Sequence, residues 1–100
     1  MTTYQTTWTV EEFAPIADTW PETVWDWQPV DTRTVATARL RQSLTAAIER
    51  HGERCDDVAR QGARQAVNRH GETEIVYLPA WNGLGDRRII VGPPEAIRGQ

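Results

Sequence analysis

Two residues whose types could do chemistry together are His51 and Cys55, four positions apart in this 100-residue chain. On a continuous helix this spacing puts both side chains on one face, where they could bind a metal or form a nucleophilic pair. Zinc takes about four ligands, however, and the only other histidine, His70, lies about five helical turns further on. No third group orients the pair, and the chain has no phosphate-binding loop and no Ser-His-Asp order. We therefore predict no metal, no cofactor and no enzymatic activity.

Aromatic and acidic residues concentrate in residues 1–31, the arm, which contain four of the five tryptophans, six acidic residues and no arginine. One interpretation is that the large rings fill a core beside alanine-rich helices. The alternative follows from helical geometry: if residues 21–27 are helical, Trp20, Val24 and Trp27 share a face and Trp25 points away from it. An exposed tryptophan beside acids suits an anchor for a protein partner. The predicted partner-binding residues are Trp20, Trp25, Asp26 and Trp27.

All eleven basic residues are arginines, and residues 32–70 contain eight of them against four acids. The formal net charge of −3 argues against general affinity for nucleic acids. Three explanations of this basic region stay open: a solvated helix face, neutralisation by the acidic arm, or a DNA-binding surface. The order helix, helix, hairpin resembles a winged helix, in which the second helix would enter the major groove. That alternative would use Arg60, Gln61, Arg64, Arg87 and Arg88.

The function that these observations favour is a non-catalytic protein-interaction module, such as a small accessory, inhibitor or assembly protein. Its size and composition would suit a phage or mobile-element origin. A protein is the expected partner, nucleic acid is the alternative, and a homodimer could form through the small residues Ala59, Gly62, Ala63 and Ala66. No apolar run approaches the roughly 18 residues that cross a bilayer, and residues 1–10 lack the features of a secretory signal. We expect a cytoplasmic protein.

The arm is expected to begin with a strand and to continue irregularly. Residues 2–10 alternate in a period of two and are rich in β-formers, which predicts a strand. Thr9 to Glu12 then has the spacing of a capping box, although Pro15 limits a helix there to a turn or two. A second short helix is expected to end at Pro29.

Two central helices are expected over residues 32–51 and 54–70. Asp31 or Thr32 would cap the first, whose apolar positions include Leu40, Leu44, Ala47 and Ile48. Both helices run into the same Arg-His-Gly-Glu ending, and Gly52 could stop the first in a left-handed conformation. Because the apolar phase also continues through Gly52, one long helix over residues 32–70 is the alternative.

A β-hairpin is predicted over residues 73–79 and 86–92, with Asn82 and Gly83 at its turn. In this register Val76 faces Ile89 and Ile75 faces Ile90, which puts apolar side chains on both faces. The helices would cover one face and the acidic arm part of the other, and residues 93–100 would form a tail. The predicted fold is a single α+β domain with two helices packed on a small antiparallel sheet. This hairpin would form the sheet, and the strand over residues 2–10 could join it.

Overall fold

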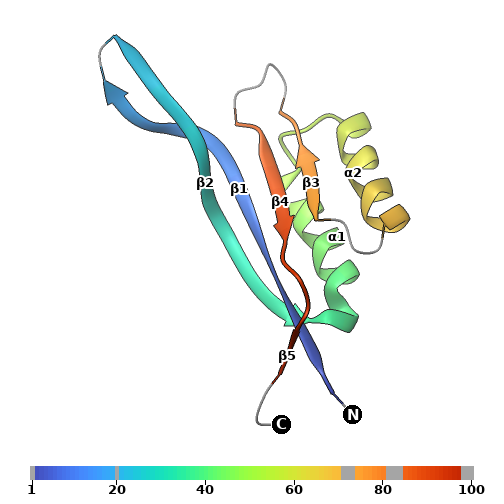
Figure 1. Ribbon diagram of the computed structural model, residues 1–100. Coiled ribbons are helices and arrows are strands. Elements are labelled where there is room, and N and C mark those ends of the chain that lie inside the picture. The colour runs from blue at the N-terminus through green and yellow to red at the C-terminus, as the bar shows by residue number, and fades with distance from the viewer. Residues whose placement is uncertain (1, 20, 71–73, 81–84, 98–100) are drawn as a thin grey trace.

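Alternating β-branched and polar residues near the start of the chain build the central strand of the sheet. The computed structural model describes residues 2–19, 21–70, 74–80 and 85–97. Within them, an antiparallel sheet has the order β2 (Glu22–Ala36), β1 (Tyr4–Thr19), β4 (Arg87–Val91), β3 (Ile75–Leu78), with β5 (Glu95–Ala96) also paired to β1. The two helices, α1 (Leu40–His51) and α2 (Asp57–His70), lie against one face of this sheet (Figure 1). The predicted α+β class, with helices packed on an antiparallel sheet, is confirmed.

The arm is a long β-hairpin, which corrects the prediction of short helices. β1 (Tyr4–Thr19) and β2 (Glu22–Ala36) pair along almost their whole length, with register shifts at Val10/Glu11 and Pro15/Ala17. β1 therefore runs straight through the predicted capping box. The acidic arm lies within the sheet beside β4, so the prediction that it covers part of the second sheet face is wrong.

The first helix begins later than predicted because residues 32–36 belong to β2. Threonine side chains join the two strands: Thr9 accepts a hydrogen bond from Thr32 at 3.2 Å, and the hydroxyls of Thr7 and Thr34 are 2.7 Å apart. These cross-strand contacts stabilise a strand where the sequence also offers a helix cap. A 3-10 turn at Thr37–Arg39 leads into α1 (Leu40–His51), which buries Leu40, Leu44, Ala47 and Ile48 as predicted.

The alternative of one long helix is wrong, because α1 ends at His51 and α2 spans Asp57–His70. Gly52 has a φ of −93°, so it does not adopt the expected left-handed conformation. Glycine is needed there for space, since a Cβ would collide with the carbonyl oxygen of Ile48. Asp56 accepts a hydrogen bond from the backbone N–H of Ala59 at 2.7 Å and caps α2. This cap places the helix start three residues after the predicted one.

The C-terminal hairpin is confirmed, with β3 (Ile75–Leu78) and β4 (Arg87–Val91) pairing Val76 with Ile89 and Ile75 with Ile90. The predicted turn at Asn82 and Gly83 lies outside the described residues. Within the predicted tail, β5 (Glu95–Ala96) pairs with the start of β1. Gly85 has a φ of 75°, a left-handed conformation that suits glycine at the entry to β4.

The core lies between the helices and one face of the sheet. Its largest fully buried side chains come from both layers: Trp8, Val10, Leu44, Ile48, Val76, Leu78 and Ile89. Trp8 also donates a hydrogen bond from its indole Nε1 to the Ser43 hydroxyl at 2.8 Å, which satisfies its one polar atom. The described part of the chain contains no helix that is long and apolar enough to cross a membrane.

Candidate functional site

The outer part of the β1–β2 hairpin projects beyond the rest of the domain. β4 pairs with β1 from Trp8 to Glu12, and the backbone N–H of Phe13 donates to the carbonyl oxygen of Asp86 at 2.9 Å. From Ala14 outward, β2 is the strand that continues beside β1 in the described part of the chain. Figure 1 shows this part, residues 13–19 and 21–30, extending away from the helices. We call it the projecting hairpin. Strands that pair outside a packed core must present both faces to their surroundings, so the side chains here are candidates for contact with another molecule.

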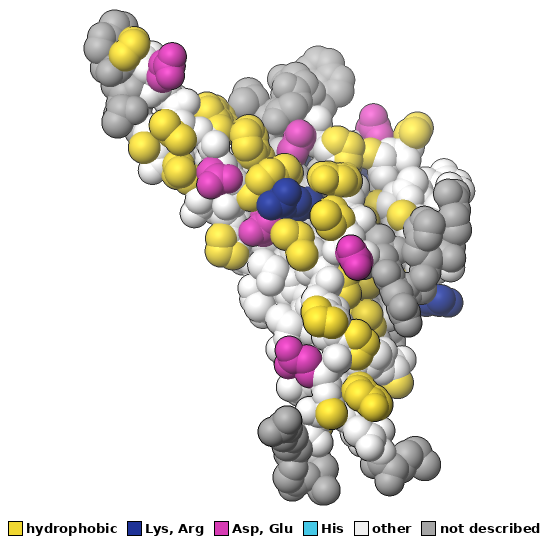
Figure 2. All heavy atoms as spheres, in the orientation of Figure 1, with side chains coloured by type: hydrophobic (Ala, Val, Ile, Leu, Met, Phe, Trp, Pro, Cys, Tyr) yellow, Lys and Arg dark blue, Asp and Glu magenta, His cyan; other side chains and the backbone are white. Residues whose placement is uncertain are grey.

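Four side chains form a continuous row of ring and cation contacts on the sheet face opposite the helices. Trp27 is paired with Phe13, and their ring centroids are 5.3 Å apart; Phe13 also stacks on Trp25 at 5.7 Å. At the inner end, the Arg88 guanidinium carbon lies 4.2 Å from the centroid of the Trp27 ring. We call Arg88, Trp27, Phe13 and Trp25 the aromatic ladder. Figure 2 views this face, where hydrophobic side chains gather around a basic one.

The ladder is fixed at its base by an ion pair across the sheet. Glu11 is the register partner of Arg88, and the Arg88 Nη2 lies 2.7 Å from the Glu11 Oε1. The Arg88 Nε donates to the same oxygen at 2.8 Å. An arginine held by a carboxylate and stacked on a ring has few accessible rotamers, so it supports Trp27 rigidly. Trp25, at the other end, remains 39% exposed.

The predicted partner-binding residues are arranged differently from the expected helix. In a strand, positions 25 and 27 share a face, so Trp25 and Trp27 lie together and Asp26 lies on the opposite face. The Asp26 carboxylate accepts a hydrogen bond from the backbone N–H of Trp27 at 2.8 Å. Trp20 lies outside the described residues. Sequence reasoning missed Phe13 and the stacking role of Arg88, although the Trp-Asp-Trp alternation could have indicated a strand.

Charge is distributed unevenly between the projecting hairpin and the body. Residues 13–30 contain three acidic residues and no basic one, whereas the rest of the chain holds eleven of each. The whole formal net charge of −3 therefore belongs to this segment. An excess of one sign on a projecting element creates a local field that attracts the opposite charge within about a Debye length, ~8 to 10 Å.

The arginines of the predicted DNA-binding surface have acidic partners within the chain. On α2, Arg60 pairs with Asp57, and Arg64 lies 3.6 Å from Glu49. Gln61 is exposed on the same helix. In the sheet, Arg88 pairs with Glu11, and the Nη2 of Arg87 lies 3.0 Å from the Glu12 Oε2. These pairings reduce the positive potential that a phosphate backbone requires.

A second polar cluster joins four elements where the projecting hairpin meets the body. His51, at the end of α1, is 2.9 Å from Asp31 of β2 through its Nε2 and 3.1 Å from the Nη1 of Arg87 through its Nδ1. Arg87 of β4 in turn donates from Nε and Nη2 to the Oε2 of Glu12, at 3.1 and 3.0 Å. We call Glu12, Asp31, His51 and Arg87 the root network.

The root network has the geometry of a structural cluster. Arginine can only donate, so the Nδ1 of His51 accepts and its Nε2 donates to Asp31. Both ring nitrogens are thereby occupied within the chain, and neither is left to exchange a proton with a substrate. The hydrogen bond from His51, with help from Arg33, lowers the pKa of Asp31 below its ordinary value of 3.8. Asp31 thus binds His51 and does not cap a helix.

Cys55 shows no sign of activation. Its side chain is buried, and burial raises the pKa of the thiol, which disfavours the thiolate needed for nucleophilic attack or metal binding. Among the described residues, no three histidine, cysteine, aspartate or glutamate side chains are grouped to hold a metal ion. On the small-residue face of α2, Ala63 is buried in the core and Ala59 packs against it. That part of the face is occupied within the chain.

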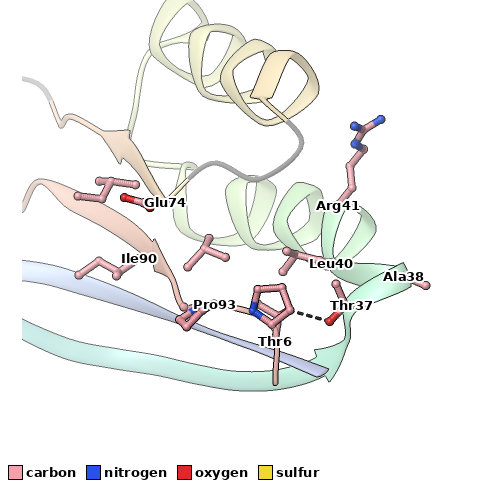
Figure 3. A pocket seen from close by; sticks show the side chains of 12 residues that line it. Thr6, Thr37, Ala38, Leu40, Arg41, Glu74, Ile90 and Pro93 are labelled. Carbon is pink, nitrogen blue, oxygen red and sulfur yellow. Dashed lines mark hydrogen bonds between the residues drawn. The ribbon is translucent and has the colours of Figure 1, made fainter. Parts of the chain in front are cut away.

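A hollow of about 900 Å³ lies between the start of α1, the start of β3 and the end of β4 (Figure 3). Most of its lining is apolar and includes Leu40, Ile75, Ile90, Val91 and Pro93. Its two threonine hydroxyls, from Thr6 and Thr37, are hydrogen-bonded to each other at 2.8 Å. Its charged lining residues, Arg41 and Glu74, lie on different sides of the hollow. The hollow therefore has no converging set of polar groups of the kind that fixes a small ligand.

Comparisons of this chain with protein-family models, with curated proteins and with solved structures found no match.

Proposed function

We propose that this chain is a non-catalytic protein-interaction module that binds a protein partner through the aromatic ladder of its projecting hairpin. The observation that carries the proposal is the state of Trp25, which is held by stacking on Phe13 and is still 39% exposed. A rigid, partly exposed tryptophan loses little conformational entropy on binding, and tryptophan is enriched among residues that dominate binding energy. Such a module would serve as a small accessory, inhibitor or assembly protein.

The neighbourhood of Trp25 supports this proposal. The ladder lies on the sheet face without helices, and other exposed apolar side chains on that face include Ile75 and Tyr77 of β3, which are 42% and 59% exposed. Exposed apolar surface with a polar rim is typical of protein-binding sites. The root network ties the base of the hairpin to α1 and β4, so the ladder would meet a partner as a preorganised surface.

Affinity purification from cells of the source organism tests the proposal with two matched variants. Trp25→Ala removes the ring at the end of the ladder. Val24→Ala changes the adjacent residue, which is 45% exposed and points to the opposite face. We expect the wild type and Val24→Ala to retain the same protein, and Trp25→Ala to lose it while keeping its circular dichroism spectrum. Equal retention by all three proteins would contradict the proposal, and so would unfolding of Trp25→Ala.

A further inference from the structure

We infer that the partner presents a basic segment whose arginine side chains stack on the exposed Trp25 ring. This inference rests on the proposed function and specifies the chemistry that the same surface recognises. It is motivated by two independent observations: the manner in which this surface already holds a guanidinium, and the distribution of charge along the chain.

The first observation is the position of Arg88, whose guanidinium lies against a tryptophan ring on this face of the hairpin. Its guanidinium carbon is 4.2 Å from the Trp27 ring centroid, and its charge is met by Glu11. A cation over a tryptophan face is attracted by the ring quadrupole, and the planar guanidinium also stacks on it. Trp25 is the next tryptophan outward on the same face, and among the described residues no arginine of this chain lies over its ring. A partner's arginine would extend the ladder by one step.

The second observation is the net charge of −3 within residues 13–30, against a balanced remainder. This charge attracts a basic segment and speeds its association. It also acts against two other occupants. A second copy of the chain would bring an equal negative charge to the same place, and a nucleic acid would bring its phosphates. A basic polypeptide is the class of partner that fits both the rings and the charge.

Proline residues favour binding on the face of the projecting hairpin over addition of a strand to its edge. β2 is an edge strand of the sheet and contains Pro29, while β1 contains Pro15 in the part that β4 does not reach. Each proline lies at one of the two register shifts. Proline cannot donate to a strand ladder, and a bulge twists the edge, so both features oppose edge pairing. The partner's side chains are therefore the groups that this hairpin recognises.

The test is a titration followed by NMR on the full chain labelled with ¹⁵N. The probe is a synthetic peptide of alternating arginine and serine, and its control has citrulline, an uncharged side chain of nearly the same shape, in place of each arginine. We expect the arginine peptide to shift the indole N–H signals of Trp25 and Trp27, and the shifts to weaken as salt is raised. Trp25→Ala should raise the dissociation constant at least about fivefold, and Val24→Ala should leave it within about twofold.

Three results would overturn the inference: no shift with the arginine peptide, equal binding of the citrulline peptide, or unchanged binding by Trp25→Ala. Shifts confined to the backbone amides of β2 would instead indicate strand addition, and they also count against it. The affinity purification separates this failure from failure of the proposed function. If Trp25-dependent capture of a protein persists while the arginine peptide does not bind, the proposed function is retained and the partner is not recognised through arginine. If capture also fails, both conclusions are wrong.

Discussion

Replacing Arg87 with methionine is expected to lower the free energy of unfolding by about 2 kcal/mol. Methionine keeps an apolar stem of similar length and removes only the guanidinium. The loss has two parts. Glu12, whose side chain is 24% exposed, loses both hydrogen bonds from Arg87, and this partly hydrated ion pair contributes about 1 kcal/mol. The Nδ1 of His51, an 11% exposed side chain, loses its donor, and an unsatisfied acceptor costs about 1 kcal/mol more.

Thermal and urea denaturation, followed by circular dichroism, measure this loss. For a domain of this size, 2 kcal/mol corresponds to a decrease in Tm of about 10 °C. The matched control is Arg64→Met, because Arg64 and Glu49 are 3.6 Å apart with side chains 45% and 63% exposed. A surface pair of this kind contributes little, so we expect a change within about 0.5 kcal/mol. Equal effects of the two substitutions would refute the reasoning that the root network stabilises the base of the hairpin.

Two further predictions concern glycine and pH. Gly52→Ala should lower the free energy of unfolding by about 1 to 3 kcal/mol, since its Cβ would meet the Ile48 carbonyl. Gly62→Ala, whose Cβ meets open space in a helix, should raise it by about 0.5 to 1 kcal/mol in urea unfolding. An increase for Gly52→Ala as well would contradict the crowding of this Cβ by the Ile48 carbonyl. The lowered pKa of Asp31 means that its stabilisation is full above 3.8 and is lost as the pH falls through the folded-state value. The difference in unfolding free energy between the wild type and Asp31→Asn should therefore shrink below pH 3.8, and a difference that stays constant into strong acid would contradict this assignment.

Local sequence patterns were sufficient to predict those elements in which the periodically spaced apolar residues are the ones that the core buries. The alternation in residues 2–10 predicted a strand, and the two runs around Val76 and Ile89 predicted a hairpin with the observed register. The apolar spacing of Leu44 and Ile48 predicted the buried face of α1. In each case the residues that repeat along the chain are also the residues that the core buries, so no distant information was needed.

Residues 11–36 were predicted wrongly because local signals and long-range pairing compete there. Thr9 to Glu12 and Asp31 have the residue types of helix caps, but a cap stabilises a helix only when the residues after it are helical. In the structure, Asp31 binds His51, twenty positions away, and Thr32 bonds across the sheet to Thr9. Neither partner can be identified from the spacing of nearby residues. Pairing over the whole hairpin therefore overrides the propensity of its short segments.

The sequence was sufficient to select Trp25 as a candidate binding residue, but not to predict how the rings of the site are arranged around it. An exposed tryptophan among acids marked Trp25 as a candidate anchor, and Trp25 is indeed partly exposed. The choice of helix assigned Trp27 to the opposite face and left out Phe13, which is joined to Trp27 only through strand pairing. Whether two rings that are close in sequence lie on one face depends on the secondary structure between them. Strand pairing between distant segments determined that here.

The position of β1 also affects how the domain folds. This strand lies between β2 and β4, so Trp8 is beside Arg33 on one side and beside Val91, near the other end of the sequence, on the other. The β1–β2 hairpin can close locally, but the sheet is complete only when the C-terminal strands arrive. Pairing between such distant segments slows folding, and sheet topologies that depend on it fold in about milliseconds to seconds, slower than a helical bundle of equal length. During synthesis, the apolar side of the β1–β2 hairpin stays uncovered until the helices and strands that follow it in the sequence have been made.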